Sequence, residues 1–226
     1  MEEKEEKISI NKEELKNETV ETAKKIRETV QNTNIKEETM ETKNFIIEML
    51  KNPIKKIAEI ANDNTGKFFN TALFLIVAWA IILFISSTAR TIGAFGFSRI
   101  FTNFVNLLKT VLTPAIGILV YSVIVLILNK KNKKSLITNI STITITQLPL
   151  IISSVVSLIK IVDSDLSTIT SPFAYVCSMA ATVLGYFGLK ELLGEKEDNI
   201  FIKQYVVIQV IYHIAYIIFG LLGIYI

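Results

Sequence analysis

Five long apolar runs constrain this chain more than any other feature. They cover about residues 68–88, 110–128, 137–162, 168–189 and 203–226. A helix rises about 1.5 Å per residue, so about 20 apolar residues cross a hydrocarbon layer roughly 30 Å thick. Apart from His213, no acidic or basic side chain lies near the centre of a run, where an Asp, Lys or Arg would cost about 2.5–3.5 kcal/mol. The sequence therefore predicts an all-α fold, a polytopic membrane bundle of five spans.

Charge divides the chain into two parts. Residues 1–66 contain 15 of the 21 acidic side chains and 12 of the 24 basic ones. Apolar residues are too sparse in residues 1–43 to form a core, so we expect a charged cytoplasmic arm that is partly helical or disordered. An amphipathic juxtamembrane helix, or two short ones, is expected over residues 44–66, and the five-span membrane domain over 67–226.

The expected juxtamembrane helix has an apolar stripe. Apolar residues recur every three or four positions at Ile46, Leu50, Ile54, Ile57 and Ile60. Within this segment, an Asn followed by a Pro is a typical helix start. Because the lysines lie off the stripe, we expect the segment to lie along an anionic inner leaflet. The alternative is that the stripe faces the protein's own spans or a partner.

The third run is unusual because Ser and Thr crowd its first half. Pro149 follows Gln147, and a proline inside a helix removes a backbone donor and causes a kink. We expect a bent helix that is held by neighbouring helices rather than by lipid, with a re-entrant segment as the alternative. Gln147, Pro149 and His213 are the candidate intramembrane polar contacts, and a neutral His213 could hydrogen-bond to the third run.

A lysine cluster separates the second and third runs. Counting Lys and Arg on alternate sides of the five runs gives 11 on the side of the N-terminus and 4 on the other. Basic residues in short loops stay in the cytoplasm. We therefore expect a multi-pass protein of the cell membrane with its N-terminus inside and its C-terminus outside. Four residues determine this topology: Lys130, Lys131, Lys133 and Lys134. Binding of anionic lipid head groups is compatible with this role, whereas the loop is too short for nucleic acid.

Two further patterns concern the remaining segments. Aromatic and apolar residues at helical spacing in residues 89–109 predict either an amphipathic helix in the outer interface or an extension of the second span. They are Phe97, Phe101, Phe104 and Leu108. In the fourth run, small residues four positions apart predict close helix packing.

No sequence motif indicates catalysis, a cofactor or a metal. The chain has one histidine and one cysteine, Cys177, and it lacks a phosphate-binding loop, a CxxC and an HExxH motif. We therefore expect a protein that is not an enzyme and that carries no cofactor.

The overall pattern resembles the Yip family of five-span membrane proteins, especially its bacterial members. The resemblance covers about residues 44–226, and the segment NPIKKIAEIA resembles the pre-membrane helix of those members. Leu148 and Pro149 resemble the end of a family segment whose Tyr and Gly are missing here. The acidic-aromatic motif of eukaryotic members is also absent. Eukaryotic relatives are linked to vesicle traffic, which bacteria lack, so that function is not transferred.

Two classes of function follow from the sequence. The first, which the sequence favours, is a non-enzymatic scaffold that binds an unknown protein partner through its N-terminal arm. The arm is long, and the spans contain almost nothing that binds an ion. The second is a small transporter or channel-forming subunit that uses the third span, broken at Pro149, together with His213. The oligomeric state is left open.

Overall fold

The computed structural model describes residues 12–32, 34–97, 99–129, 132, 134–162, 164–195 and 197–221, which contain no strand. The all-α prediction is therefore confirmed for the described residues. Contacts divide the chain into two units, residues 1–33 and residues 34–226. The first unit contains α1 (Lys12–Asn32). The second contains α2 (Ile35–Lys51), α3 (Pro53–Ala61), α4 (Phe69–Phe95), α5 (Arg99–Thr102), α6 (Phe104–Leu128), α7 (Leu136–Thr146), α8 (Leu148–Ser157), α9 (Ile159–Val162), a 3-10 turn (Ser164–Leu166), α10 (Ser167–Leu193) and α11 (Asp198–Leu221).

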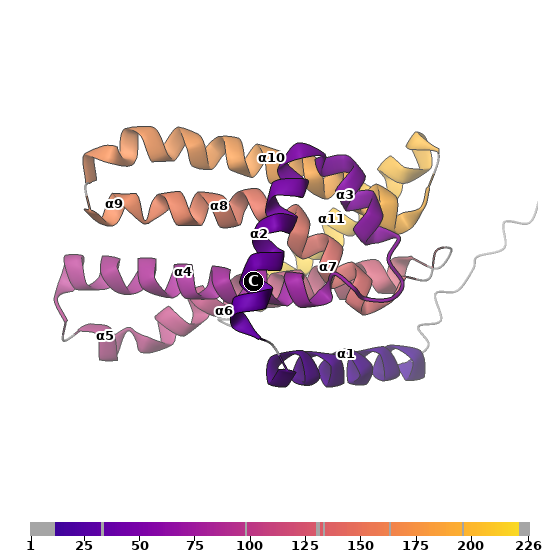
Figure 1. Cartoon of the computed structure of the whole chain (residues 1–226), viewed down its shortest axis with the longest axis horizontal. Helices are drawn as coiled ribbons and strands as arrows, with labels where there is room; N and C mark the ends of the chain where they lie inside the picture. Colours follow the sequence, from indigo (N-terminus) through magenta and orange to yellow (C-terminus); the bar gives the residue numbers. More distant parts are fainter. Residues whose placement is uncertain are drawn as a thin grey trace, which may run out of the picture. The chain divides into compact units, whose positions relative to one another are not determined.

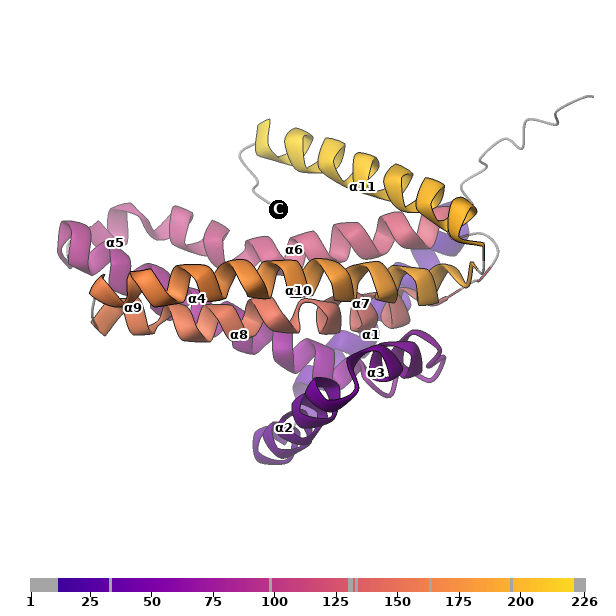
Figure 2. The same cartoon turned by 90° about the horizontal axis from the view of Figure 1, so that it is seen from above.

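Four helices are long and apolar enough to cross a membrane: α4, α6, α10 and α11. A fifth crossing is possible if α7 and the helices that follow it are one span, bent by 45°. Figure 1 shows α7 near the end of the bundle where α6 and α10 finish, and α9 near the opposite end. Figure 2 shows the long helices of this unit running side by side.

Helix α7 is the centre of the second unit. All 11 of its residues are buried, and it packs against α3, α4, α6 and α10. Two of its hydroxyl groups bond within the helix: Ser141 and Thr142 donate to the carbonyl oxygens one turn earlier, at 2.8 and 2.9 Å. Thr138 donates instead to the carbonyl oxygen of Asp63 at 2.8 Å, and the buried hydroxyl of Thr144 has no partner among the described residues. Ser135 caps the first turn by accepting a hydrogen bond from the backbone N–H of Thr138. Protein therefore surrounds the first half of the third run, as predicted, whereas Val155 and Ile159 in the second half are exposed.

The predicted kink in the third run is also confirmed. Helix α7 ends before Gln147, and Pro149 lies in the first turn of α8, where a missing N–H leaves no helical hydrogen bond unmade. The carbonyl oxygen of Gln147 accepts from the backbone N–H groups of Leu150 and Ile151, at 2.9 and 3.2 Å. The break is therefore a well-bonded junction between two helices.

The juxtamembrane segment consists of two helices, which is one of the two predicted alternatives. Helices α2 and α3 meet at Asn52, and α3 packs against α7 and α10. Ile57 and Ile60 are buried, whereas Leu50 and Ile54 are 66% and 50% exposed. The expected stripe facing lipid is therefore wrong for Ile57 and Ile60, which face the protein's own helices because α3 packs against α7 and α10.

These two helices share a hydrophobic cluster with the spans. The α2 and α3 members are Phe45, Met49, Ile57 and Ile60, and the others are Phe68, Leu75, Ile145, Leu148 and Ile151. Burial of apolar surface contributes about 25 cal/mol per Å². The cluster therefore fixes α2 and α3 to the bundle independently of lipid.

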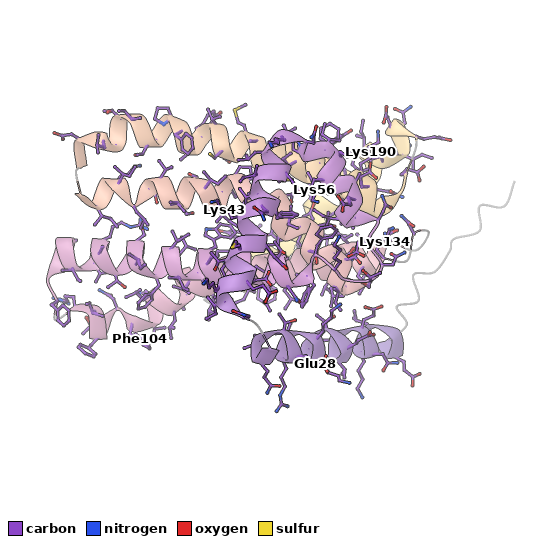
Figure 3. All side chains as sticks on the ribbon, viewed as in Figure 1. Glu28, Lys43, Lys56, Phe104, Lys134 and Lys190 are labelled. Carbon is purple, nitrogen blue, oxygen red and sulfur yellow. The ribbon has the colours of Figure 1, made fainter. Side chains whose placement is uncertain are left out.

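Lys56, labelled in Figure 3, forms ion pairs at the corner between α2 and α3. Its ammonium nitrogen lies 2.7 Å from a carboxylate oxygen of Glu48 and 3.1 Å from one of Glu59. It also lies 5.5 and 5.2 Å from the ring centres of Phe45 and Phe68. Desolvation lowers the pKa of Lys56, but the two carboxylates outweigh it, so the net pKa is raised. The lysine therefore stays charged at this corner.

Polar contacts join several elements at the end of the bundle where α7 begins. The side-chain amides of Asn129 and Asn132 donate to the carbonyl oxygen of Leu192, at 2.8 and 3.2 Å. Lys134 is buried, and its ammonium group donates to the side-chain oxygen of Asn62 at 3.1 Å. Lys134 thus also links the turn to the end of α3. The other predicted topology residues, Lys130, Lys131 and Lys133, lie outside the described residues.

The segment 89–109 does not form one amphipathic helix. Helix α4 continues to Phe95 and ends at Gly96, which has a φ of +78° that favours glycine. The four residues of the predicted stripe are exposed, but they belong to three elements: Phe97 precedes α5, Phe101 is in α5, and Phe104 and Leu108 are in α6. The alternative, an extension of the second span, holds for the last two.

Candidate intramembrane binding site

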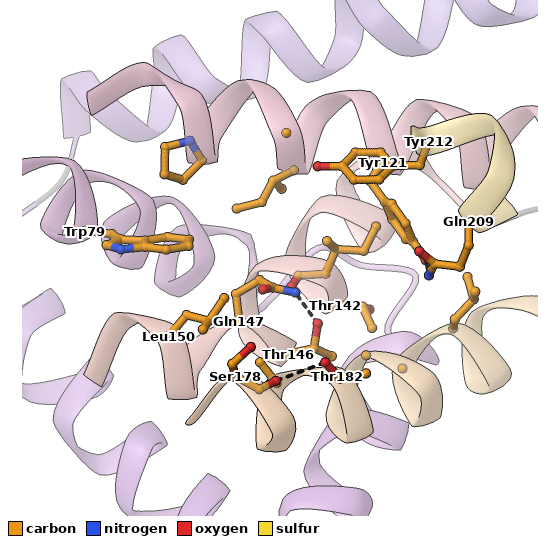
Figure 4. A pocket seen from close by; sticks show the side chains of 18 of the residues that line it. Trp79, Tyr121, Thr142, Thr146, Gln147, Leu150, Ser178, Thr182, Gln209 and Tyr212 are labelled. Carbon is orange, nitrogen blue, oxygen red and sulfur yellow. Dashed lines mark hydrogen bonds between the residues drawn. The ribbon is translucent and has the colours of Figure 1, made fainter. Parts of the chain in front are cut away.

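A cavity of about 430 Å³ lies within the bundle, lined by residues of α4, α6, α7, α8, α10 and α11 and by Gln147. Figure 4 shows Trp79, Gln147, Thr182, Gln209 and Tyr212 around it. Small-molecule sites usually fall between about 300 and 1,000 Å³. The cavity is therefore large enough for a small organic molecule.

The break in the third run forms one wall. Thr142 and Thr146 line the cavity from α7, Leu150 lines it from α8, and Gln147 lies between the two helices. Because the helix axis turns by 45° here, α8 does not continue along the line of α7. Gln147, one of the predicted polar contacts, lies half-buried at the edge of this cavity. Pro149 is not among the lining residues and contributes through the bend.

Helix α10 provides a wall of small side chains. Ser178, Ala181, Thr182 and Gly185 line the cavity, although their spacing predicted close helix packing. A Cβ atom at Gly185 would meet no atom within 4 Å. The close approach occurs instead at Gly188, where a Cβ atom would lie 2.8 Å from Thr146 Cγ2. Ala181 is buried, in agreement with the predicted close packing, whereas Gly185 faces open space and the close approach at Gly188 lies outside the predicted ladder.

An aromatic and amide wall closes the side formed by α6 and α11. Gln209 donates from its side-chain amide to the hydroxyl oxygen of Tyr121 at 2.8 Å. The rings of Tyr121 and Tyr212 pack edge to face, with their centres 5.1 Å apart. On the opposite side, Trp79 Nε1 donates to Ser154 Oγ at 2.9 Å. None of these residues was among the predicted site residues. The polar Gln209 inside an apolar run is the one sequence feature that indicates this wall.

His213 does not belong to the site. Its Nδ1 lies 2.8 Å from the carbonyl oxygen of Gln209 in its own helix, and the side chain is exposed. The predicted contact between His213 and the third run is therefore wrong. The i−4 carbonyl offers the imidazole a local partner, so no second helix is needed to satisfy the ring.

The described lining of this cavity has no acidic or basic side chain. Thr146 and Thr182 donate their hydroxyl hydrogens to carbonyl oxygens of their own helices, at 2.7 and 3.0 Å, which leaves their oxygens able to accept. A charged guest would be desolvated here without a counter-charge, at a large free-energy cost. The site therefore suits an uncharged molecule that has polar groups and an apolar or ring surface.

The described residues contain no cluster of three or more His, Cys, Asp or Glu side chains that could hold a metal ion. Taken with the fold, this cavity defines a class: an all-helical protein with four helices able to cross a membrane and an uncharged polar site between them. No family model, curated protein or solved structure matches the chain.

Proposed function

We propose that the protein is an integral membrane carrier that binds a small uncharged polar molecule in the cavity beside Gln147. The observation that carries this proposal is the position of the cavity, which lies against the broken third run and has no charged lining among the described residues. In many secondary transporters, substrate sites lie near interrupted helices at the middle of the membrane.

The proposal treats α7, α8 and α9 as one broken span, the fifth of the bundle. Two observations support this. Helix α7 begins near the ends of α6 and α10, and α9 finishes near the opposite end of the bundle (Figure 1). Such a path crosses the bundle, whereas a re-entrant segment would return to its starting side. The buried surroundings of α7 allow irregular backbone at membrane depth.

Filling the cavity tests the carrier proposal. We expect liposomes containing the wild-type protein to equilibrate glycerol or sorbitol faster than empty liposomes, as measured by stopped-flow light scattering. Gly185→Leu places a side chain in open space within the cavity and should return the rate to that of empty liposomes. Val183→Leu is the matched control, because Val183 is exposed on the same helix and does not line the cavity. Equal rates for all three proteins and for empty liposomes would contradict the proposal.

A scaffold that binds a partner through its N-terminal arm is the second candidate function. It is supported by α1, a mostly polar helix on which Val20 and Val30 are 60% and 66% exposed. Deletion of residues 1–33 separates the two functions within the same liposome assay. A carrier keeps its flux without this unit, whereas a flux that depends on residues 1–33 favours the arm. Membership of the Yip family also stays a proposal.

The orientation of the chain is a further part of the proposal, supported by the uneven distribution of lysine and arginine. We expect the N-terminus in the cytoplasm, the C-terminus outside, and the cell membrane as the location. In a Cys177→Ser background, a membrane-impermeant maleimide added to whole cells should label Asp165→Cys and spare Asn132→Cys. The reverse labelling would exclude this orientation.

A further inference from the structure

We infer that the end of the bundle near α9 carries a binding site for the phosphate head group of an anionic phospholipid. A second cavity, of about 550 Å³, lies at this end and is separate from the carrier site. Its lining residues are Ser86, Ala89, Arg90 and Gly93 of α4, Ser157 of α8, Lys160 and Ile161 of α9, and Ser167 of α10. The two sites share none of their described lining residues.

Charge identifies the kind of ligand. Arg90 and Lys160 come from different helices and line one hollow, and no Asp or Glu is among its described lining residues. Within the described part of the chain, neither side chain forms an ion pair. Two cations and the hydroxyl groups of Ser86 and Ser167 around one space match a phosphate, because its oxygens accept several charge-assisted hydrogen bonds. The third lining serine, Ser157, already donates its hydroxyl hydrogen to the carbonyl oxygen of Ser154 at 2.7 Å.

Local hydrogen bonds orient Arg90 and Lys160 and leave some of their N–H groups free to bind a ligand. Arg90 Nε and Nη2 donate to the carbonyl oxygen and the hydroxyl oxygen of Ser86, both at 3.3 Å. Lys160 Nζ donates to Ser171 Oγ at 3.1 Å. Since a guanidinium has five N–H groups and an ammonium three, each side chain retains donors for a ligand.

The position of the cavity favours a lipid over a free anion. Arg90 lies 21 residues after Phe69 in α4, which is about 30 Å along the helix at 1.5 Å per residue. That distance matches the hydrocarbon thickness, so Arg90 reaches the head-group level when α4 spans the membrane. Exposed apolar side chains lie in or beside the lining: Ile161 of α9 lines the cavity, and Ile85 and Ile92 of α4 are sequence neighbours of lining residues. These side chains can contact the acyl chains of a lipid.

Lipid retention by the purified full-length protein tests this inference. Native mass spectrometry after mixing with equal amounts of phosphatidylglycerol and phosphatidylcholine should show preferential retention of phosphatidylglycerol. The double variant Arg90→Gln, Lys160→Gln should weaken this retention by at least about tenfold, because each basic residue contributes roughly 1 kcal/mol towards an anionic lipid. Gly93→Leu keeps both charges but fills the hollow, and its Cβ meets no atom within 4 Å, so it should weaken retention in a folded protein.

Arg99→Gln is the control, because Arg99 lies in α5 and does not line the cavity. It should retain phosphatidylglycerol as the wild type does. Equal losses in the control and in the double variant would reduce the effect to general surface charge and overturn the site. Equal thermal stabilisation by inorganic phosphate and by phosphatidylglycerol would show a free-anion site and overturn the lipid assignment. Unchanged retention of phosphatidylglycerol in both the double variant and Gly93→Leu would overturn the site itself.

Discussion

Ile57→Glu should lower the stability of the protein in detergent by roughly 4 kcal/mol, or prevent folding. Ile57 is 0% exposed and belongs to the hydrophobic cluster that joins α3 to the spans. A glutamate there would be a buried charge without a partner, and such charges cost about 3–5 kcal/mol. The midpoint of thermal unfolding, measured by loss of monodispersity on heating, reports the change.

Ile54→Glu is the matched control for this prediction. Ile54 lies three residues earlier in the same helix and is half exposed, so a charge there can remain hydrated. Its effect in detergent should stay within about 0.5 kcal/mol, as for most surface substitutions. Equal stability of the two variants would contradict the packing of α3 and restore the lipid-facing stripe that the sequence predicts.

Gly188→Leu should destabilise the bundle by about 1–3 kcal/mol, the usual range for overpacking. A Cβ atom at this position would lie 2.8 Å from Thr146 Cγ2 and 3.3 Å from Thr142 Cγ2. Thr146 cannot turn away without loss, because its hydroxyl group donates to the carbonyl oxygen of Ile143 at 2.7 Å. Helix α10 would have to move away from α7, and thermal unfolding in detergent measures the cost.

Gly185→Leu is the control on the same helix, since a Cβ atom there meets nothing within 4 Å. We expect its stability to equal or exceed that of the wild type. A second check uses the pair Gly188→Ala and Thr146→Ser, because the serine removes the methyl group that the new Cβ would meet. The double variant should be more stable than Gly188→Ala alone. A Gly188→Ala protein as stable as the wild type would show that α7 and α10 do not approach closely here.

The all-α fold follows from the amino-acid sequence alone. Runs of about 20 residues without central charges can bury their backbone polar groups in lipid only as helices, and four such helices are present. The local sequence also predicts the positions of two helix breaks correctly. Pro53 begins α3 and Pro149 lies in the first turn of α8, because a proline is tolerated in a first turn and disruptive further inside a helix.

The buried faces, in contrast, follow from the packing of the helices. The periodicity of residues 44–62 marks an apolar stripe, but lipid and protein are both apolar, so the pattern cannot tell one from the other. The same ambiguity explains Gly185 and Gly188: both are small and both line the cavity, yet the packing of α7 against α10 leaves open space at Gly185 and brings Thr146 close to Gly188. Lys134 shows the same limit for polar groups, because its partner Asn62 is distant in sequence. The cavities depend on helices distant in sequence, so their lining follows from the three-dimensional packing rather than from any local pattern.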